Sequence, residues 1–347
     1  MKKDTLKSIS ERAGVSATTV SRILNGNAEK YRISKPTVKL VLSEADRYDY
    51  LSRVTAKRLR QNKSSIIGLL VPSVSEYHFA TLASMIIKYN NENGFATIVA
   101  DIQNDAQREK NEICNLLSRG IEGLIVAPSS QNGQFLKNIE KDIPVIQIDR
   151  YIQDLPLCSI CSNNVRIGRT LTELLILNGH KKIACLQGIS GISSNDERVK
   201  GYLDTMEEAG LEPMVYGNTF DSQESYYETL EMMKSSDLPT AIVTLANGQA
   251  LGVLNAIVKL GLKVPDDISI VTVDDNKYMN LISPQITRAV QPLDNIAKLS
   301  CRTLNQVIKG EKNGTSSITL SPMLIIGESV KNINTSYNND TEKLFCR

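Results

Sequence analysis

Polar side chains that follow apolar, β-rich runs are the first candidates for binding chemistry in this chain of 347 residues. Asp149 and Asp274 each come directly after such a run, and Asn247 closely follows a third. Arg198 and Phe220 stand in the segments between them. A planar Arg guanidinium, carboxylates and an amide can hydrogen-bond several neighbouring hydroxyl groups, while an aromatic ring covers the apolar face of a sugar. Together these residue types favour the binding of a small polyhydroxylated molecule.

Each of these residues also has an ordinary structural explanation. Asp149 and Asp274 are typical of residues that cap a turn. Phe220 can belong to the core, and Arg198 can form a surface ion pair, which contributes little stability. Taken one at a time, the structural explanation is favoured for each residue, so the binding hypothesis depends on a wider pattern.

Catalytic and metal chemistry find weaker support. Two carboxylates raise the alternative of a carbohydrate-cleaving enzyme, because glycosidases use paired Asp or Glu side chains. Cys158 and Cys161 have metal-ligand spacing, but residues three apart on the expected strand point to opposite faces. His78 and His180 are the only histidines, and neither has a cysteine or carboxylate cluster at ligand spacing. We therefore expect no catalytic residues, no metal and no cofactor.

Charge divides the chain near Lys63. Residues 1–63 contain 15 Lys and Arg against six Asp and Glu, a net charge of +9, and the remainder carries −7. A small basic module joined to a larger acidic one indicates a polyanionic partner for the first part only. The chain has no apolar run long enough for a transmembrane helix and no secretory signal, so we expect a cytoplasmic protein.

The basic module has the pattern of short helices around a glycine turn. A helix is expected from Leu6, capped by Thr5 and ended by Gly14, and a second over 17–24, capped by Ser16. A third is expected to open near Pro36. Two short helices around such a turn are typical of the helix-turn-helix motif, whose second helix enters the major groove.

The run 5–26 closely resembles the DNA-binding headpiece of the lactose/galactose repressor (LacI/GalR) family. The resemblance rests on the Ala-Gly-Val-Ser turn at 13–16 and the Thr-Val-Ser-Arg stretch at 19–22. The connection 28–33 is longer than is usual in the family. The resemblance implies that the following headpiece residues contact DNA: Thr5, Ser16, Ala17, Thr18, Thr19, Ser21, Arg22 and Asn25.

The segment 53–60 resembles the family's hinge helix, although Ser52-Arg53 replaces the usual Pro-Asn. In relatives this helix orders on operator DNA and inserts a Leu side chain into the minor groove. By position Leu59 is the wedge, with Ala56 beside it. Such a wedge unstacks a base step, and the contacts that the bend allows offset that cost.

From Ser65 onward, β-rich runs alternate with helical segments. This alternation, with Ile- and Val-rich strands, predicts parallel sheets with helices on both faces. In such sheets ligands bind outside the carboxyl ends of the strands. Strands are expected at 66–71, 96–100, 123–126, 144–148, 182–186, 241–245 and 269–273, with helices at 79–93, 106–119, 166–178, 196–209 and 250–260.

The family resemblance continues to about Lys331. It implies a small all-α helix-turn-helix headpiece followed by an α/β, periplasmic-binding-protein-like effector domain of two doubly wound subdomains. The expected division is a headpiece over 1–51, a hinge and linker over 52–63, an effector and dimerisation domain over 64–331, and a disordered tail over 332–347.

The resemblance also gathers the polar residues into one effector site. Glu197–Tyr202 matches the family's Glu-Arg-x-x-Gly-aromatic segment, and Asn247-Gly248 departs from its more usual Asn-Asp. The implied effector-binding residues are Ser73, Tyr77, Asp149, Arg198, Phe220, Asn247, Gln249 and Asp274.

The resulting hypothesis is a transcriptional regulator controlled by a ligand. It implies a homodimer that binds double-stranded, near-palindromic operator DNA at the nucleoid, without a membrane partner, and represses transcription. The effector is expected to be a sugar or sugar derivative. The alternatives are a carbohydrate-binding receptor, which the headpiece contradicts, and a carbohydrate-acting enzyme.

Overall fold

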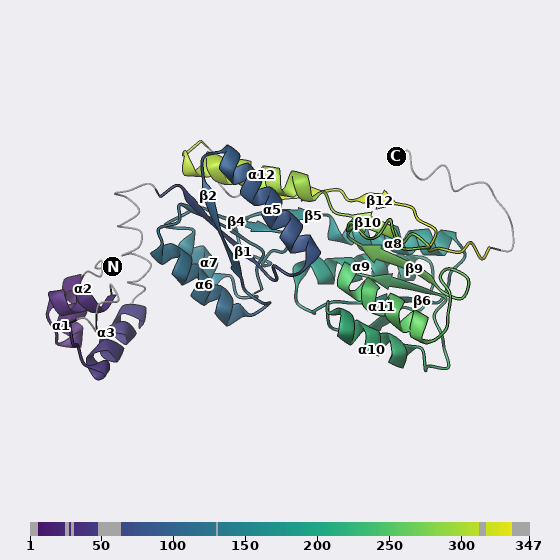
Figure 1. Ribbon diagram of the computed structural model, residues 1–347, viewed down its shortest axis with the longest axis horizontal. Helices are drawn as coiled ribbons and strands as arrows, with labels where there is room; N and C mark the ends of the chain where they lie inside the picture. Colours follow the sequence, from purple (N-terminus) through teal and green to yellow (C-terminus); the bar gives the residue numbers. More distant parts are fainter. Residues whose placement is uncertain are drawn as a thin grey trace.

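The computed structural model describes residues 6–24, 28, 31–47, 64–129, 131–311 and 317–334 (Figure 1). Part of the expected DNA-binding apparatus and most of the tail lie outside the described residues. These are Thr5, Asn25, Ala56, Leu59, the hinge segment 52–63, and 335–347.

The N-terminal unit is a cluster of three helices around a small core. The helices are α1 (Leu6–Ala13), α2 (Ala17–Leu24) and α3 (Lys35–Arg47). Ile9, Val20 and Val41 are completely buried between them. Gly14 has φ 63°, a left-handed conformation that glycine adopts without strain, and it separates α1 from α2 as the sequence predicts.

The remaining described chain forms two α/β units, each built on a six-stranded sheet. The first sheet is parallel throughout, in the order β11 (Ile318–Leu320), β5 (Cys158–Ser162), β4 (Val145–Ile148), β3 (Gly123–Val126), β1 (Ile66–Val71), β2 (Ala96–Asp101). The second has the order β12 (Met323–Ile325), β10 (Thr287–Val290), β9 (Ser269–Val273), β8 (Ala241–Thr244), β6 (Ile183–Leu186), β7 (Met214–Tyr216), and only β12 is antiparallel to its neighbour.

Helices cover both faces of each sheet, which confirms the doubly wound α/β fold. On the first sheet, α5 (Tyr77–Glu92) and α12 (Leu293–Ile308) pack on one face and α6 (Ala106–Ser118) and α7 (Gln134–Ile139) on the other. On the second, α8 (Asn164–Leu177) and α9 (Ser193–Glu208) oppose α10 (Ser222–Met232) and α11 (Asn247–Lys259). Strands β3, β4, β6, β8 and β9 are buried along their whole length, as a sheet covered on both faces requires.

The chain passes between the two units three times. The connections run from β5 to α8, from β10 to α12, and from β11 to β12. They are short, at 163, 291–292 and 321–322. Three short crossings join the units side by side, with the strand ends after β4 and β9 near each other (Figure 1).

Helices α8 and α9 approach each other more closely than side chains normally allow. A Cβ atom added to Gly168 would lie 2.0 Å from the Arg198 carbonyl oxygen, and one added to Gly201 would lie 2.1 Å from the Val165 carbonyl oxygen. Glycine is therefore required at both positions. This contact fixes the backbone of the segment that carries Arg198.

Several boundaries and elements differ from the sequence-based expectation. Helix α9 begins at Ser193 and α11 at Asn247, each three residues earlier than expected. Helices α7, α10 and α12 and strands β7, β10, β11 and β12 were not expected, and three of these strands are only three residues long. In the part of the chain that is described, no helix is both long and apolar enough to cross a lipid bilayer.

Candidate functional site

Asp149 and Asp274 occupy equivalent places in the two α/β units. Each directly follows the carboxyl end of a strand, β4 for Asp149 and β9 for Asp274. Their φ angles are 61° and 76°, in the left-handed region that non-glycine residues rarely adopt. Such strain persists where the surrounding structure enforces it and is frequent at functional sites. Both carboxylates are buried.

His78, on the first turn of α5, bridges these two carboxylates. Its Nε2 lies 2.7 Å from Asp149 Oδ1 and its Nδ1 lies 3.4 Å from Asp274 Oδ1. The first contact is a hydrogen bond, and the second is an ion pair without hydrogen-bond geometry. Since Asp149 and His78 belong to the first unit and Asp274 to the second, one imidazole ties the two units together.

The three groups stabilise one another's charged forms. Burial alone would lower the pKa of His78, but the charges of Asp274 and Asp149 outweigh it and raise that pKa to about 10. Burial would raise the pKa of each carboxyl group, yet the His78 charge lowers both, and the pKa of Asp274 falls to about 2. At neutral pH the bridge is therefore an imidazolium between two carboxylates.

Arg198, a predicted effector-binding residue, lies beside this bridge. Its Nε donates to Asn164 Oδ1 at 2.8 Å and its Nη1 donates to the Leu245 carbonyl oxygen at 2.7 Å. Its charge also contributes to the lowered pKa of both carboxyl groups. Gln291, in the second connection between the units, donates from Nε2 to Asp274 Oδ1 at 2.7 Å.

Arg150 continues the site from Asp149 towards solvent. Its Nη1 donates to Asn104 Oδ1 at 2.7 Å. Its guanidinium carbon lies 5.4 Å from the ring centre of Phe79 and 5.7 Å from that of Phe220. The predicted ring-stacking residue Phe220 therefore faces an arginine that comes from the other unit.

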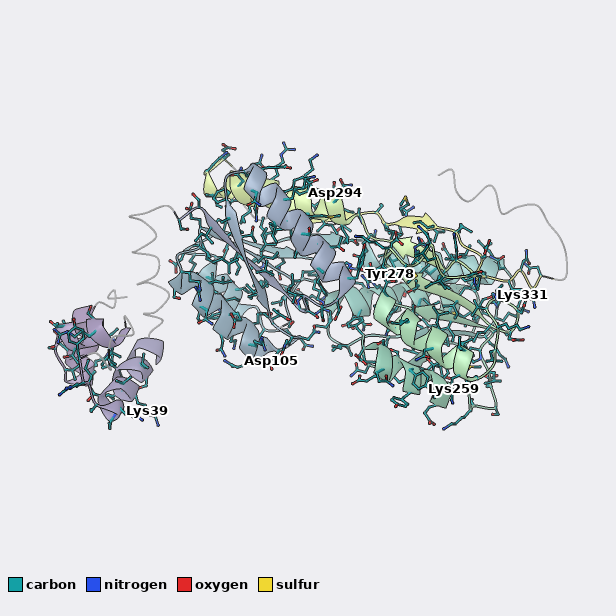
Figure 2. All side chains as sticks on the ribbon, viewed as in Figure 1. Lys39, Asp105, Lys259, Tyr278, Asp294 and Lys331 are labelled. Atoms are coloured by element: carbon teal, nitrogen blue, oxygen red, sulfur yellow. The ribbon has the colours of Figure 1, made fainter. Side chains whose placement is uncertain are left out.

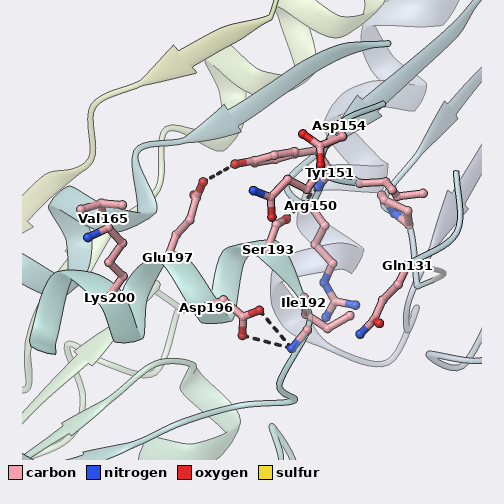
Figure 3. Close-up of a pocket in the computed structure, with 14 residues that line it drawn as sticks. Gln131, Arg150, Tyr151, Asp154, Val165, Ile192, Ser193, Asp196, Glu197 and Lys200 are labelled. Carbon is pink, nitrogen blue, oxygen red and sulfur yellow. Dashed lines mark hydrogen bonds between the residues drawn. The ribbon is translucent and has the colours of Figure 1, made fainter. Parts of the chain in front are cut away.

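A cavity of about 720 Å³ opens beside Arg150 (Figure 3). Both units contribute to its wall, through the segment after β4 and the first turns of α9. Tyr151 donates from its backbone N–H to Ser193 Oγ at 2.9 Å, and its hydroxyl donates to a Glu197 carboxylate oxygen. None of the eight predicted effector residues lines this cavity.

Gln249, a predicted effector contact, has backbone groups of the protein as its partners. The side chain is completely buried, and its Oε1 accepts from the Leu245 backbone N–H at 2.8 Å. Its Nε2 donates to the carbonyl oxygens of Gln187 and Thr219 at 2.9 and 2.7 Å. The amide is thus occupied by backbone groups and holds three strand-end loops together behind the site.

The other predicted effector residues are less central than Asp149, Arg198 and Asp274. Ser73 Oγ lies 2.8 Å from Ser75 Oγ in the turn before α5, and Tyr77 is about one-third exposed at the start of that helix. Asn247 Nδ2 donates to the Asp275 carbonyl oxygen at 3.3 Å, while its buried Oδ1 has no partner.

Sequence reasoning missed His78, Arg150 and three residues of the cavity wall, Tyr151, Ser193 and Glu197. Arg150 and Tyr151 directly follow Asp149, and Glu197 precedes Arg198. Their positions at predicted strand and helix ends were the available signal. His78 carried no such signal, because its partner Asp149 is 71 residues away along the chain. Among the described residues, no group of three or more His, Cys, Asp or Glu side chains could hold a metal ion.

In the headpiece, α2 presents a polar face. Ser16 Oγ accepts from the Thr19 backbone N–H at 3.0 Å and caps the helix. Ala17, Thr18 and Arg22 are exposed, while Ser21 is half-buried. The Arg22 guanidinium carbon lies 3.9 Å from the ring centre of Tyr31, which belongs to the unusually long connection before α3.

Comparison with known proteins agrees with both parts of the chain. Residues 5–52 match the model of bacterial regulatory proteins of the lacI family. Residues 64–312 match the model of periplasmic binding proteins and the sugar-binding domain of the LacI family. The HTH-type transcriptional regulator DegA of Bacillus subtilis is 28% identical over 340 residues, which cover 96% of this chain and 100% of DegA.

Solved structures show the same fold. A periplasmic binding protein/LacI transcriptional regulator from Alkaliphilus metalliredigens, complexed with D-xylulofuranose, has a TM-score of 0.70 at 26% identity and covers 77% of this chain and 99% of its own. The lac repressor dimer bound to operator and the anti-inducer ONPF has a TM-score of 0.71 at 24% identity and covers 95% of this chain and 100% of its own.

A helix-turn-helix unit joined to two α/β units around a binding cleft defines the class of ligand-controlled transcriptional regulators. This chain belongs to the LacI family of bacterial regulatory proteins. The family is one of transcriptional regulators, which does not favour the alternative of a carbohydrate-cleaving enzyme.

The His78 bridge predicts a characteristic dependence of stability on pH. The folded-state pKa of His78, about 10, lies above its unfolded value near 6.5, so its contribution is complete below pH 6.5 and disappears as the pH rises towards 10. His78→Gln should lower the melting temperature by roughly 3 °C or more at pH 6.5, where 1 kcal/mol corresponds to about 2–4 °C. This difference from the wild type should shrink steadily up to pH 10 in calorimetry.

His180→Gln is the matched control. Burial lowers the pKa of His180, so this residue is neutral in both states above pH 7. Any loss of melting temperature in this variant should stay constant between pH 7 and 10. A His78→Gln deficit that is equally constant over that range would contradict the charged bridge.

Proposed function

We propose that the protein acts at the nucleoid as a homodimeric repressor whose affinity for a near-palindromic operator is set by a sugar or sugar derivative. The ligand enters the cavity beside Arg150 and engages the groups around the His78 bridge. The single observation that carries this proposal is the ion bridge between the two units at the carboxyl ends of both sheets, beside a cavity of about 720 Å³. Sugar binding by a relative is consistent with it, since the Alkaliphilus protein was solved with D-xylulofuranose.

The bridge supplies a mechanism for ligand control. Asp149 and Asp274 are held by His78 when no ligand is present, which favours one closure angle of the two units. Ligand hydroxyl groups that hydrogen-bond these carboxylates would compete with the imidazolium. A ligand shifts an equilibrium only by its difference in affinity for the two states. Effector contacts to both units would therefore change the angle between the units and, through the linker, the spacing of the two headpieces.

We propose a chain division into a headpiece over 1–51, a hinge over 52–63, an effector and dimerisation domain over 64–331 and a tail over 332–347. The two family matches, over 5–52 and 64–312, support the first boundaries. The proposed DNA contacts are the headpiece residues Thr5, Ser16, Ala17, Thr18, Thr19, Ser21, Arg22 and Asn25 and the hinge residues Ala56 and Leu59. The proposed effector set keeps Asp149, Arg198, Phe220 and Asp274 and adds His78 and Arg150, with Ser73, Tyr77 and Asn247 at its edge.

Ligand control can be tested with the full chain and an operator selected from a library of palindromic duplexes. Fluorescence anisotropy at constant salt measures the dissociation constant with and without pentoses, hexoses, sugar acids and sugar phosphates. At least one of these should change operator affinity about 10-fold or more, which corresponds to a coupling free energy of about 1.4 kcal/mol. Operator binding that responds to none of these molecules would contradict a sugar-class effector.

Arg22 is the best candidate for reading a base in the major groove. Its side chain is exposed on α2, and an arginine that hydrogen-bonds guanine with two donors contributes about 1–3 kcal/mol of discrimination. Arg22→Ala should reduce the ratio of operator to scrambled-duplex affinity by roughly 10-fold, while a ligand-induced shift in melting temperature is unchanged. An unaltered ratio at matched salt would exclude Arg22 from base recognition. Lys39→Ala, on the exposed side of α3, is the control and should leave the ratio unchanged.

An exposed apolar strip on α11 fits the homodimer contact. Leu251 is 61% exposed and Val258 75% exposed on this helix, which ends at Lys259 (Figure 2). The neighbouring loop adds Tyr278 and is held in place by the buried Arg288, whose Nε donates to Asp275 Oδ1 at 2.7 Å. Apolar side chains gathered in this way mark interaction surfaces.

Leu251→Glu combined with Val258→Glu should convert the dimer to a monomer in sedimentation velocity runs. Operator affinity should fall roughly 100-fold, because two linked headpieces bind far more tightly than one. Leu177→Glu, which places the same charge on an exposed leucine of α8, should leave the dimer intact. A double variant that remains dimeric would show that the copies meet through another surface.

A further inference from the structure

The connection between α2 and α3 brings an aromatic ring onto the exposed end of α2. The guanidinium carbon of Arg22 lies 3.9 Å from the ring centre of Tyr31, which is a close cation–π contact. Both side chains are exposed, Tyr31 at 45%, so the pair lies on the surface of the headpiece and not in its core. A contact of this kind on α2 concerns the face that the proposed function places against DNA.

The turn that carries Tyr31 is anchored on both sides of it. The Ile33 backbone N–H donates to the Ala28 carbonyl oxygen at 2.9 Å. Ala28 and Ile33 also pack against the buried core of the headpiece. Directly after Ile33, Ser34 Oγ accepts from the Thr37 backbone N–H at 3.4 Å and caps α3. The packing of the headpiece therefore places the Tyr31 ring beside α2.

The stack covers a face of the Arg22 guanidinium and leaves its N–H donors available. Among the residues that the structure describes, none forms a hydrogen bond or an ion pair with the Arg22 side chain. The five N–H donors of a guanidinium point outward in its plane, so a ring above that plane does not occupy them. Guanine presents two acceptors, O6 and N7, to a pair of such donors in the major groove.

Stacking also restricts a side chain that otherwise has many rotamers. Arg22 lies in the last turn of α2, at the end of a long and flexible side chain. Fixing these rotamers on a base costs free energy, and a neighbour that fixes them before binding reduces that cost. The Tyr31 ring has no charge, so it adds nothing to the attraction between Lys or Arg side chains and phosphates. Its contribution therefore concerns specific binding and not general affinity for DNA.

We propose that Tyr31 is a positioning residue for base recognition, whose ring holds the Arg22 guanidinium ready to hydrogen-bond a guanine in the major groove. This inference rests on the proposed function, which assigns base reading to Arg22. The connection 28–33, longer than is usual in the family, thereby contributes to operator specificity through α2.

The test uses the full chain, the selected operator and a scrambled duplex, with fluorescence anisotropy at matched salt. Tyr31→Ala should reduce the ratio of operator to scrambled-duplex affinity about threefold or more, in the range of a cation–π contact. Affinity for the scrambled duplex and the slope of its salt dependence should be unchanged, because no charge is lost. A residue needed only for the fold of the headpiece would lower both affinities together.

Three further variants separate the aromatic face from the rest of the side chain. Tyr31→Phe keeps the ring and should leave the affinity ratio unchanged. Tyr31→Leu keeps apolar volume without an aromatic face and should show the same loss as Tyr31→Ala. Leu42→Ala, which truncates another exposed side chain of the headpiece, is the control and should leave the ratio unchanged.

A double-mutant cycle then assigns the effect to Arg22. In the Arg22→Ala background, Tyr31→Ala should leave the affinity ratio unchanged, because no guanidinium remains for the ring to hold. The loss should also vanish on an operator in which the base pair read by Arg22 is replaced. That base pair is the position at which Arg22→Ala loses its preference.

Three results would overturn the inference. A Tyr31→Ala loss that persists in the Arg22→Ala background would show that Tyr31 contacts DNA itself. A ratio that rises in Tyr31→Ala would show that the stack holds Arg22 away from its base. If Arg22→Ala lowers the ratio and Tyr31→Ala does not, Arg22 reads its base unaided and the proposed function stands. An Arg22→Ala variant with an unaltered ratio would instead remove the assigned base contact from the proposed function, and this inference with it.

Discussion

The contact of one imidazolium with two carboxylates is the interaction on which the arrangement of the effector domain depends. Asp149 and Asp274 would repel each other as bare carboxylates at the facing ends of two sheets, and burial would increase that repulsion. His78 removes it by standing between them, at 2.7 and 3.4 Å. The short, threefold connection between the units limits their relative motion, and the His78 bridge adds a contact between them at the strand ends.

In the proposed mechanism, control by a ligand follows from the same contact, because the ligand would use the acceptors that the bridge uses. Asp149 and Asp274 have left-handed backbone conformations at the strand ends, and His78 pairs with both of their carboxylates in the absence of ligand. A ligand must therefore supply better partners than the imidazolium does, or bind beside it. This requirement gives selectivity, since a molecule that contacts only one unit gains nothing from changing the closure angle.

The sequence predicted the parts of this site that local pattern determines. The headpiece helices α1 and α2 begin where capping residues and the glycine turn place them, and Asp149, Arg198 and Asp274 could be placed from strand ends and from the family resemblance. The burial of a side chain, and its partners from distant parts of the sequence, could not be predicted in this way. Gln249 follows a strand and has the chemistry of a ligand-binding amide, yet its orientation depends on the loops at Gln187 and Thr219, which only the folded chain brings together.

Charge balance shows why the missed residues matter most. His78, Arg150 and Arg198 bring three positive charges to the neighbourhood of the buried carboxylates of Asp149 and Asp274. Glu76 is a third carboxyl group of this cluster and interacts through its charge with His78 and Arg150. The bridge alone carries one positive and two negative charges, and the charge of Arg198 beside it balances the difference. Arg150 stands at the outer edge of the cluster, beside the cavity.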